Sequence, residues 1–184
     1  NPALAAQLLD QAGYVRGNDG RRSKGNQSLA FTITTQDNNV YRNVAQVLRR
    51  QWEAVGASVD IVALSDDDLQ TTLSPQGHSY DVLLYGIALG ADPDVFAYWH
   101  SSQAAITSAT RLNFSEFQSV AADKSLEAGR TRPEADVRAS KYKSFLIAWR
   151  DDAPAVALYQ PRYLYLSREP LYGFEPSLLN SGAD

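Results

Sequence analysis

The sequence predicts an α/β domain whose small, mostly parallel sheet is flanked by helices. Three segments, residues 29–35, 58–64 and 80–88, have the pattern of β-strands, and helical segments separate them. A helical crossover returns the chain to the edge where the next strand begins, so these connections favour parallel pairing with right-handed crossovers. The 184 residues are enough to enclose a hydrophobic core.

Each strand is indicated by its own residue pattern. Residues 29–35 alternate with period two, and residues 58–64 have the composition of a second strand. Residues 80–88 are almost continuously apolar, which is typical of a strand buried on both faces.

Two helices are expected around the first strand. Asn1 and Pro2 suit the N-cap and the first helical position, and Gly13 suits the position after the last turn. Residues 40–55 place valines and a leucine on one helical face, and Gly56 ends that helix.

The remaining segments are assigned by breakers and caps. Residues 15–27 are polar and contain glycines, which predicts a loop. Ser65 and Asp68 resemble a capping box that opens a short helix to Leu73. The second half is expected to be mainly helical, with helices at 95–99, at 120–128 after a Ser115–Gln118 capping box, and from Glu134 to Pro154, followed by late strands at 155–159 and 163–167.

Composition excludes several classes of function. The net charge of −4 makes a nucleic-acid partner unexpected, because binding phosphates requires a basic surface. No apolar run is long enough to span a membrane, and no signal peptide is visible. Cysteine is absent, which removes disulfides, thiolate metal sites and a cysteine nucleophile. Methionine is also absent, so we expect that the native chain begins before residue 1.

The sequence offers no convincing catalytic set, so we expect no enzyme, no metal and no cofactor. His78 and His100 are the only histidines, too few for a histidine-rich metal site. The acidic run at 66–68 is interpreted as the first turn of a helix rather than a calcium site. Asp92 and Asp94 are interpreted as caps of the helix that follows, with ligand contact and acid–base catalysis as the alternatives.

Several short motifs occur in a characteristic order, and together they cover almost the whole chain. They are Asn1-Pro2-Ala3 with Ala12-Gly13-Tyr14, Gln51-Trp52 with Val55-Gly56, Tyr80-Asp81 to Gly86, Asp92-Pro93-Asp94 with Phe96, Asn113-Phe114, and Ala153-Pro154 with Leu158-Tyr159. In this order and spacing the chain resembles the C-terminal part of the family 5 extracellular solute-binding proteins, the peptide and nickel type that serves ABC importers.

The resemblance implies a lobe of a type II periplasmic-binding-protein-like fold that closes on its ligand together with a second lobe. Residues 1–154 would form the ligand-binding lobe, and residues 155–184 would cross the hinge back to an N-terminal lobe outside this sequence. The expected partners are a peptide or small-molecule ligand and the permease subunits of an ABC transporter. We expect an extracytoplasmic monomer, in the periplasm or at the cell surface, with any lipid anchor outside this sequence.

The ligand contacts are expected where the third strand ends. Ligands of open α/β sheets bind beyond the carboxyl ends of the strands, and small residues let backbone groups approach a peptide-like ligand. Glycines at 86 and 90 that serve only turn geometry are the alternative. The candidate ligand-binding residues are Tyr85, Gly86, Ile87, Ala88, Leu89, Gly90 and Asp92.

The sequence departs from the family pattern at two places. Ile87 stands where peptide binders of the family usually carry tryptophan, and Leu89 or Gly90 stands where they often carry the aspartate that holds the peptide ammonium. Asp92 could substitute for that aspartate if the loop shifts. Otherwise the ligand would be a blocked peptide, a sugar, a metal chelate or another solute.

Two other classes of function stay open at this stage. A sensor or regulatory module could use the same lobe without transport, and a fused signalling domain in the full gene would favour it. An enzyme of unknown type is the third alternative, and it would require turnover that is lost when Asp92 or Asp94 is mutated.

Overall fold

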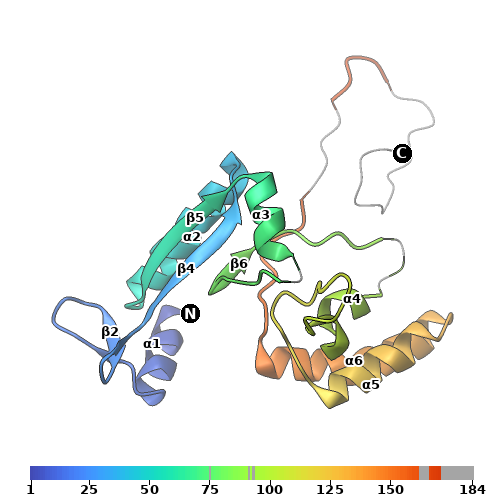
Figure 1. Ribbon diagram of the computed structural model, residues 1–184, viewed down its shortest axis with the longest axis horizontal. Coiled ribbons are helices and arrows are strands. Elements are labelled where there is room, and N and C mark those ends of the chain that lie inside the picture. The colour runs from blue at the N-terminus through green and yellow to red at the C-terminus, as the bar shows by residue number, and fades with distance from the viewer. Residues whose placement is uncertain (75, 91, 93, 162–165, 171–184) are drawn as a thin grey trace. The chain divides into compact units, whose positions relative to one another are not determined.

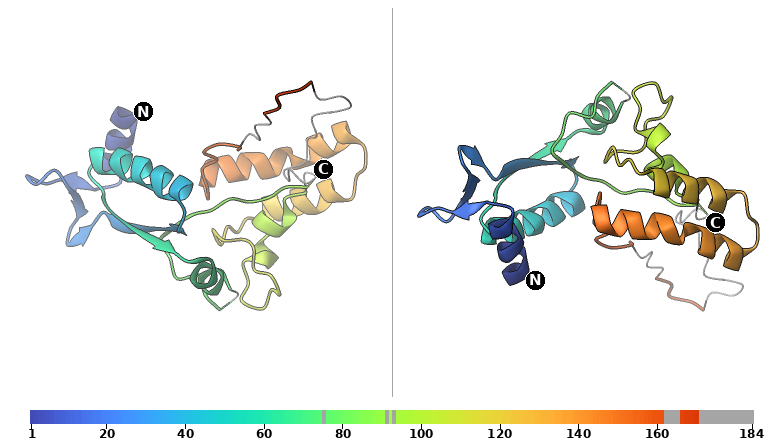
Figure 2. Two further views of the ribbon diagram at one scale, coloured as in Figure 1. Left: turned by 90° about the horizontal axis from the view of Figure 1, so that it is seen from above. Right: turned by 90° about the horizontal axis from the view of Figure 1, so that it is seen from below.

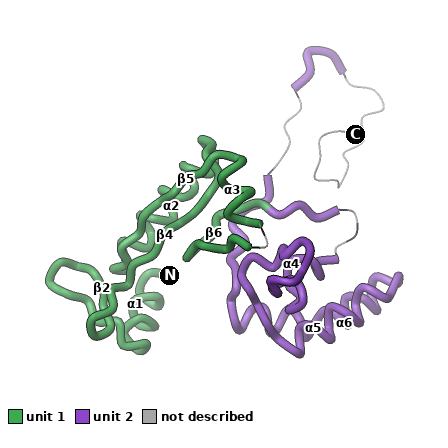
Figure 3. The backbone as a smooth tube through the Cα atoms, in the orientation of Figure 1, with its two compact units in different colours: residues 1–86 green, residues 87–184 purple. Residues whose placement is uncertain are grey.

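The structure is a computed structural model of the chain, and it describes all residues except 75, 91, 93, 162–165 and 171–184. The chain divides into two compact units, residues 1–86 and residues 87–184 (Figure 3). Each unit has its own hydrophobic core, so each is considered separately.

Unit 1 contains the parallel sheet that the sequence predicts (Figure 1). Strand β4 (Ala30–Gln36) lies in the centre, between β5 (Ser58–Leu64) and β6 (Val82–Leu84). Strand β4 pairs in parallel with β5 from Ala30↔Ser58 to Gln36↔Leu64, and with β6 from Ile33↔Val82 to Thr35↔Leu84.

The third strand is much shorter than the predicted segment 80–88, and this prediction of its length was wrong. The side chain of Asp81 accepts a hydrogen bond from the backbone N–H of Thr32 at 2.8 Å, so this amide of β4 is bound by a carboxylate. Beyond Leu84 the partner strand ends at Gln36, and Tyr85 and the residues after it are mostly exposed. The apolar segment 80–88 therefore predicted that a strand occurs there, but it did not predict where the strand begins and ends.

Helix α2 (Asn39–Ala54) and helix α3 (Asp66–Leu73) cover opposite faces of this sheet (Figure 2). The α2 face is amphipathic as predicted, and it buries the core of the unit. Burying apolar side chains on one face of a sheet under a helix is the main stabilising term of such a layer. The buried apolar residues of this core are Ile33, Ala45, Ala57, Val59 and Leu84.

The segment 15–27, predicted as a loop, instead forms a small antiparallel sheet after helix α1 (Pro2–Gln11). Its strands are β1 (Val15–Arg16), β2 (Arg22–Lys24) and β3 (Gln27–Ser28). Gly20 and Gly25 adopt positive φ, which allows the tight turns between these short strands. Arg22 is only 4% exposed and binds the Asp10 carboxylate and the carbonyls of Tyr14 and Val55, which ties this sheet to its neighbours.

Unit 2 is mainly helical, as the sequence predicts. It contains α4 (Phe96–Trp99), the 3-10 turn η1 (Ser101–Gln103), α5 (Val120–Arg130) and α6 (Ala135–Asp152). Helix α5 is capped by Ser119, whose hydroxyl accepts from the N–H of Ala122, so the predicted Ser115–Gln118 box was wrong. Ser115 instead donates to the side-chain oxygen of buried Asn113. The buried apolar residues of this unit are Phe117, Ala122, Leu126 and Phe145.

The C-terminal segment differs from the prediction. Residues 155–159 are described and form no strand, because a strand requires a partner edge and Val156, Leu158 and Tyr159 are exposed. The second late strand, predicted at 163–167, lies largely outside the described residues. No helix in the described part of the chain is long and apolar enough to cross a membrane.

The end of β6 is held by one buried side chain. Thr35 is fully buried, and its hydroxyl donates to the backbone carbonyl of Leu84 at 2.9 Å. Replacing Thr35 with valine keeps the shape but leaves that carbonyl without this donor, so we expect a loss of about 1–3 kcal/mol in the free energy of unfolding.

The measurement is chemical denaturation of the complete gene product, with Thr34→Val as the matched control. Thr34 is on the same strand and is also buried, but its side chain lines a groove and its hydroxyl makes no hydrogen bond to a described residue. Its variant is therefore expected to stay within about 0.5 kcal/mol of wild type. Equal losses in both variants would contradict the role given to Thr35.

Candidate functional site

The carboxyl ends of the three parallel strands meet at one edge of the unit 1 sheet, and helices α2 and α3 begin there. A chain of side-chain hydrogen bonds joins these helix starts. Asn38 donates to the Gln36 side-chain oxygen at 3.0 Å, and Gln36 donates to Asp66 at 2.6 Å. Asn38 also accepts from the N–H of Tyr41 as the N-cap of α2. Hydrogen bonds between polar side chains therefore connect the starts of α2 and α3 at this edge.

Two of the predicted site residues, Tyr85 and Gly86, lie at this edge directly after β6. Tyr85 is 37% exposed, and Gly86 is exposed as well. Gly86 does not have a positive φ, so turn geometry does not explain the glycine. A Cβ atom at this position would lie 2.6 Å from the hydroxyl oxygen of Tyr41. The missing side chain at 86 thus makes room for the first turn of α2.

The next four predicted residues belong to unit 2. Ile87 is 43% exposed, and Ala88 and Gly90 are exposed. The backbone carbonyl of Ala88 accepts a hydrogen bond from the hydroxyl of Tyr98 at 3.1 Å, which restrains this segment. At Gly90 φ is not positive, and no described atom lies within 4 Å of where a Cβ would be. Gly90 therefore leaves open space beside an exposed backbone.

Asp92, the last predicted residue, is bound to an arginine. Arg138 of α6 contacts both carboxylate oxygens of Asp92, one at 3.3 Å and one closer. This hydrogen bond holds the pKa of Asp92 below its usual value and raises that of Arg138. The Asp92 carboxylate also accepts from the N–H of Asp94. The Asp92 carboxylate is thus already bound by groups of unit 2.

Asp94 is held in the same way. Its carboxylate accepts from the N–H of Phe96, the first residue of α4, and pairs with Arg130 at 2.9 Å. The N-cap position of α4 is Val95, which makes no side-chain cap hydrogen bond. The predicted capping role is therefore only partly right, because Asp94 binds the first helical N–H from one position earlier and Asp92 binds none. The Arg130 guanidinium also lies 4.2 Å from the centre of the Phe96 ring, and that ring stacks on His100 at 4.0 Å. The acidic motif therefore fastens α4 to the helices α5 and α6.

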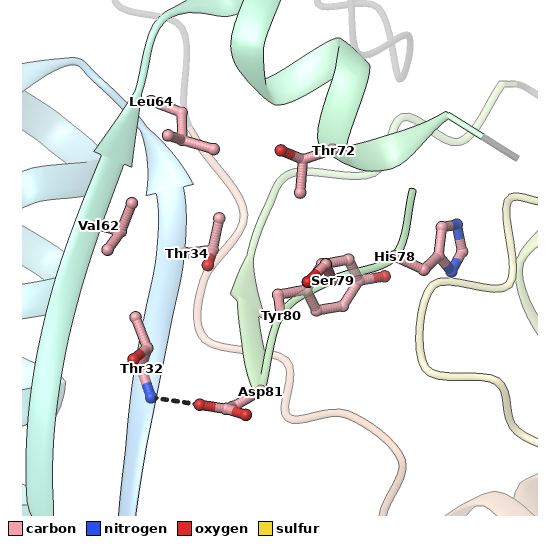
Figure 4. A pocket seen from close by; sticks show the side chains of 9 residues that line it. All are labelled: Thr32, Thr34, Val62, Leu64, Thr72, His78, Ser79, Tyr80 and Asp81. Carbon is pink, nitrogen blue, oxygen red and sulfur yellow. Dashed lines mark hydrogen bonds between the residues drawn. The ribbon is translucent and has the colours of Figure 1, made fainter. Parts of the chain in front are cut away.

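A groove that the sequence did not indicate lies on the face of the unit 1 sheet away from α2 (Figure 4). Its volume is about 680 Å³, and hydroxyl groups are frequent on its walls. None of the predicted ligand-binding residues lines it. The lining residues are Thr32, Thr34, Val62, Leu64, Thr72, His78, Ser79, Tyr80 and Asp81.

Sequence reasoning missed the side chains that arrange the predicted segment: Tyr41, Tyr98 and Arg138. Tyr41 had a usable signal, since it lies in the first turn of a helix that follows a parallel strand. Tyr98 and Arg138 are 10 and 46 residues from their partners, and no local pattern relates them. Among the described residues, no group of histidine, aspartate and glutamate is placed to hold a metal ion.

Comparison with known proteins assigns the family. The family model described as "Bacterial extracellular solute-binding proteins, family 5 Middle" matches residues 1–108, more than half of the chain. The chain belongs to this family. The resemblance seen in the sequence motifs is therefore confirmed.

Individual relatives agree. The chain is 26% identical over 177 residues to the oligopeptide-binding protein AppA of Bacillus subtilis, covering 95% of this chain and 32% of that protein. The crystal structure of NikZ from Campylobacter jejuni in complex with Ni(L-His) superposes with a TM-score of 0.74 at 25% identity, over 84% of this chain and 31% of NikZ. The structure of AppA with a nonapeptide also gives 0.74, at 24% identity, over 84% of this chain and 30% of AppA.

The chain corresponds to only part of each of these relatives. The chain spans about a third of the length of the relatives it matches. These relatives are solute-binding proteins rather than enzymes, and the family is described as extracellular. The α/β lobe with its small parallel sheet is the fold that the two superposed structures share with this chain.

We expect the Asp92–Arg138 pair to make the stability of unit 2 slightly sensitive to acid, because the Asp92 side chain is 66% exposed and solvent screens its charge. Because the pKa of Asp92 is lowered in the folded state, the pair stabilises the fold above the unfolded-state pKa of about 3.9. That contribution is lost as the pH falls through the lowered folded-state value. We expect Asp92→Asn to unfold at a lower temperature than wild type near pH 7, and the gap to close as the pH falls below about 4.

Thermal unfolding of the complete gene product at low salt, from neutral to acidic pH, measures this gap. Asp151→Asn is the control, because its partner Arg150 is 73% exposed whereas Arg138 is 15% exposed, and a pair exposed on both sides contributes little. A gap for Asp92→Asn that is unchanged in strong acid would show that the charge pair is not its cause.

Proposed function

We propose that the chain is part of the substrate-binding component of an ABC importer. In this proposal the complete protein captures oligopeptides, or a similar small solute, outside the cytoplasmic membrane by closing two lobes on the ligand. Membership of the family supports it, together with the superposition on a nonapeptide-binding protein and on a Ni(L-His)-binding protein.

The observation that carries the proposal is the exposed backbone that follows β6. Tyr85, Gly86 and the segment 87–90 are largely exposed, and the two glycines are not explained by left-handed backbone geometry. The small size of Gly86 leaves its backbone exposed at the carboxyl edge of the unit 1 sheet, and ligands of open α/β sheets bind at such edges. Gly90 leaves its backbone exposed within unit 2. An extended peptide can be held there by main-chain hydrogen bonds.

The charges of the acidic motif constrain the ligand. Both Asp92 and Asp94 are paired with arginines, so a ligand ammonium at either carboxylate would share it with a guanidinium whose positive charge opposes the approach. We therefore propose that the amino group of a peptide ligand is not held by these residues. Asp92 then acts on the site by holding its segment rather than by contacting the ligand.

A non-peptide solute is the second candidate. The specific observation in its favour is that NikZ, which carries Ni(L-His), superposes on this chain as well as AppA does. In that case the small residues at 86–90 would accept a compact metal chelate rather than a peptide main chain.

The remaining parts of the proposal concern the whole protein. We propose that it works with the permease subunits of an ABC transporter as a monomer, without catalysing a reaction, in the periplasm or at the cell surface. We further propose that residues 1–154 belong to one ligand-binding lobe and that residues 155–184 lead across the hinge.

A capture function predicts stabilisation by ligand. A ligand that binds only the folded protein at about 100 times its Kd stabilises it by about 2.7 kcal/mol. We expect the unfolding temperature of the complete gene product to rise with a tripeptide, a nonapeptide or Ni(L-His), and the ligand that produces the shift identifies the class. No shift with any peptide or chelate would contradict the proposal.

Bulk at Gly90 should block the ligand without disturbing the fold. A leucine there has space and no unfavourable φ, so Gly90→Leu is expected to unfold at the wild-type temperature. Its ligand affinity should fall by more than about tenfold, because the side chain would occupy the ligand's path. Calorimetric titration measures this, with Ala109→Leu in an exposed loop as a control of similar added bulk. Wild-type affinity in Gly90→Leu would remove this residue from the site.

A further inference from the structure

The hydroxyl of Tyr41 stands beside the backbone at Gly86, and this contact is not part of the sequence pattern. A Cβ at residue 86 would lie 2.6 Å from the Tyr41 hydroxyl oxygen and 3.9 Å from its Cζ, so the phenol tip is the group that approaches. Both residues belong to unit 1. Tyr41 therefore presents a polar group at the edge of the sheet where the proposed ligand contacts begin.

The position of Tyr41 is fixed by its surroundings. Its ring packs against the hydrophobic core under α2, and its N–H donates to the N-cap residue Asn38 at 3.0 Å. Asn38 is bound in turn to Gln36, and Gln36 to Asp66 at the start of α3. Side chains held by packing and by further hydrogen bonds are the ones that can select a ligand group by geometry.

We propose that Tyr41 is a specificity-determining residue of the ligand site, and that its hydroxyl hydrogen-bonds a main-chain group of a peptide ligand beside Gly86. This inference rests on the proposed function. A hydroxyl can donate one hydrogen bond and accept others, so it can take a main-chain group of a ligand in addition to a partner within the protein. It carries no charge, which suits recognition of a peptide main chain rather than of its charged ends.

Gly86 and Tyr41 then act as a pair. Any side chain at 86 would meet the phenol hydroxyl, and the far end of a tyrosine can shift more easily than backbone can. Gly86→Ala should therefore displace the Tyr41 hydroxyl while the fold remains intact. In a Tyr41→Phe background the hydroxyl is already absent, so the same alanine should have a smaller additional effect.

The test uses the complete gene product, with calorimetric titration of a tripeptide and a nonapeptide, each with a free and an acetylated amino terminus. Tyr41→Phe keeps the ring in the core and removes the hydroxyl. We expect the affinity of the peptide that binds best to fall roughly three- to tenfold, the range of one hydrogen bond between neutral groups. Free and acetylated forms should lose the same factor, because the contact is with the main chain.

Tyr14→Phe is the matched control. Tyr14 is also in unit 1, but it lies next to Arg22 and the small antiparallel sheet. We expect its affinity to stay at the wild-type value. Thermal unfolding of each unliganded variant separates a loss of ligand contacts from a loss of stability.

The outcomes are distinguishable. Wild-type affinity in Tyr41→Phe, an equal loss in Tyr14→Phe, or fully additive effects of Tyr41→Phe and Gly86→Ala would each overturn the role of Tyr41 while leaving the capture function intact. If wild type binds none of the peptides, the peptide-binding function itself fails and this inference fails with it. A selective, non-additive loss in Tyr41→Phe supports the proposal.

Discussion

Parallel pairing of β4 with both of its neighbours is the constraint on which unit 1 depends. Because β4, β5 and β6 run in the same direction, their carboxyl ends lie at one edge, and the helices that follow β4 and β5 must begin there. That edge therefore collects Gln36, Asn38 and Tyr41 from one connection and Asp66 from the other. The buried hydroxyl of Thr35 fixes the end of β6 in the same register, so that Tyr85 and Gly86 emerge beside these groups.

In unit 2 the acidic motif has a structural role that a purely functional interpretation would miss. Asp92 and Asp94 each accept a backbone N–H two residues later in the chain, and each is held by an arginine from a different helix. The arginine partners neutralise both carboxylates. In the proposed function, ligand recognition beside this motif would therefore fall to neutral groups, namely exposed backbone and hydroxyls. In the same unit, the Tyr98 hydroxyl donates a hydrogen bond to the backbone carbonyl of Ala88.

Much of the secondary structure could be predicted because its signals are local. Asn1 caps α1, Gly56 has the left-handed φ that ends α2, and β5 spans the predicted residues 58–64. The failures occurred where a distant partner decides the outcome. The apolar segment 80–88 is a strand only where β4 offers it an edge, residues 155–159 have no such edge, and the polar segment 15–27 forms strands because Arg22 and two glycines allow it.

The sequence by itself determined the parallel α/β order, the family resemblance and the choice of residues 85–92 as the candidate contacts. These follow from periodicity, capping residues and the order of short motifs, all of which act over a few residues. Only the tertiary structure decided what surrounds those contacts. It placed Tyr41 over Gly86, left Gly90 open and paired Asp92 with Arg138, which lies 46 positions away. The physical reason is that strand register and helix packing determine which distant side chains meet. Neither can be predicted from the residues that neighbour a side chain in the sequence.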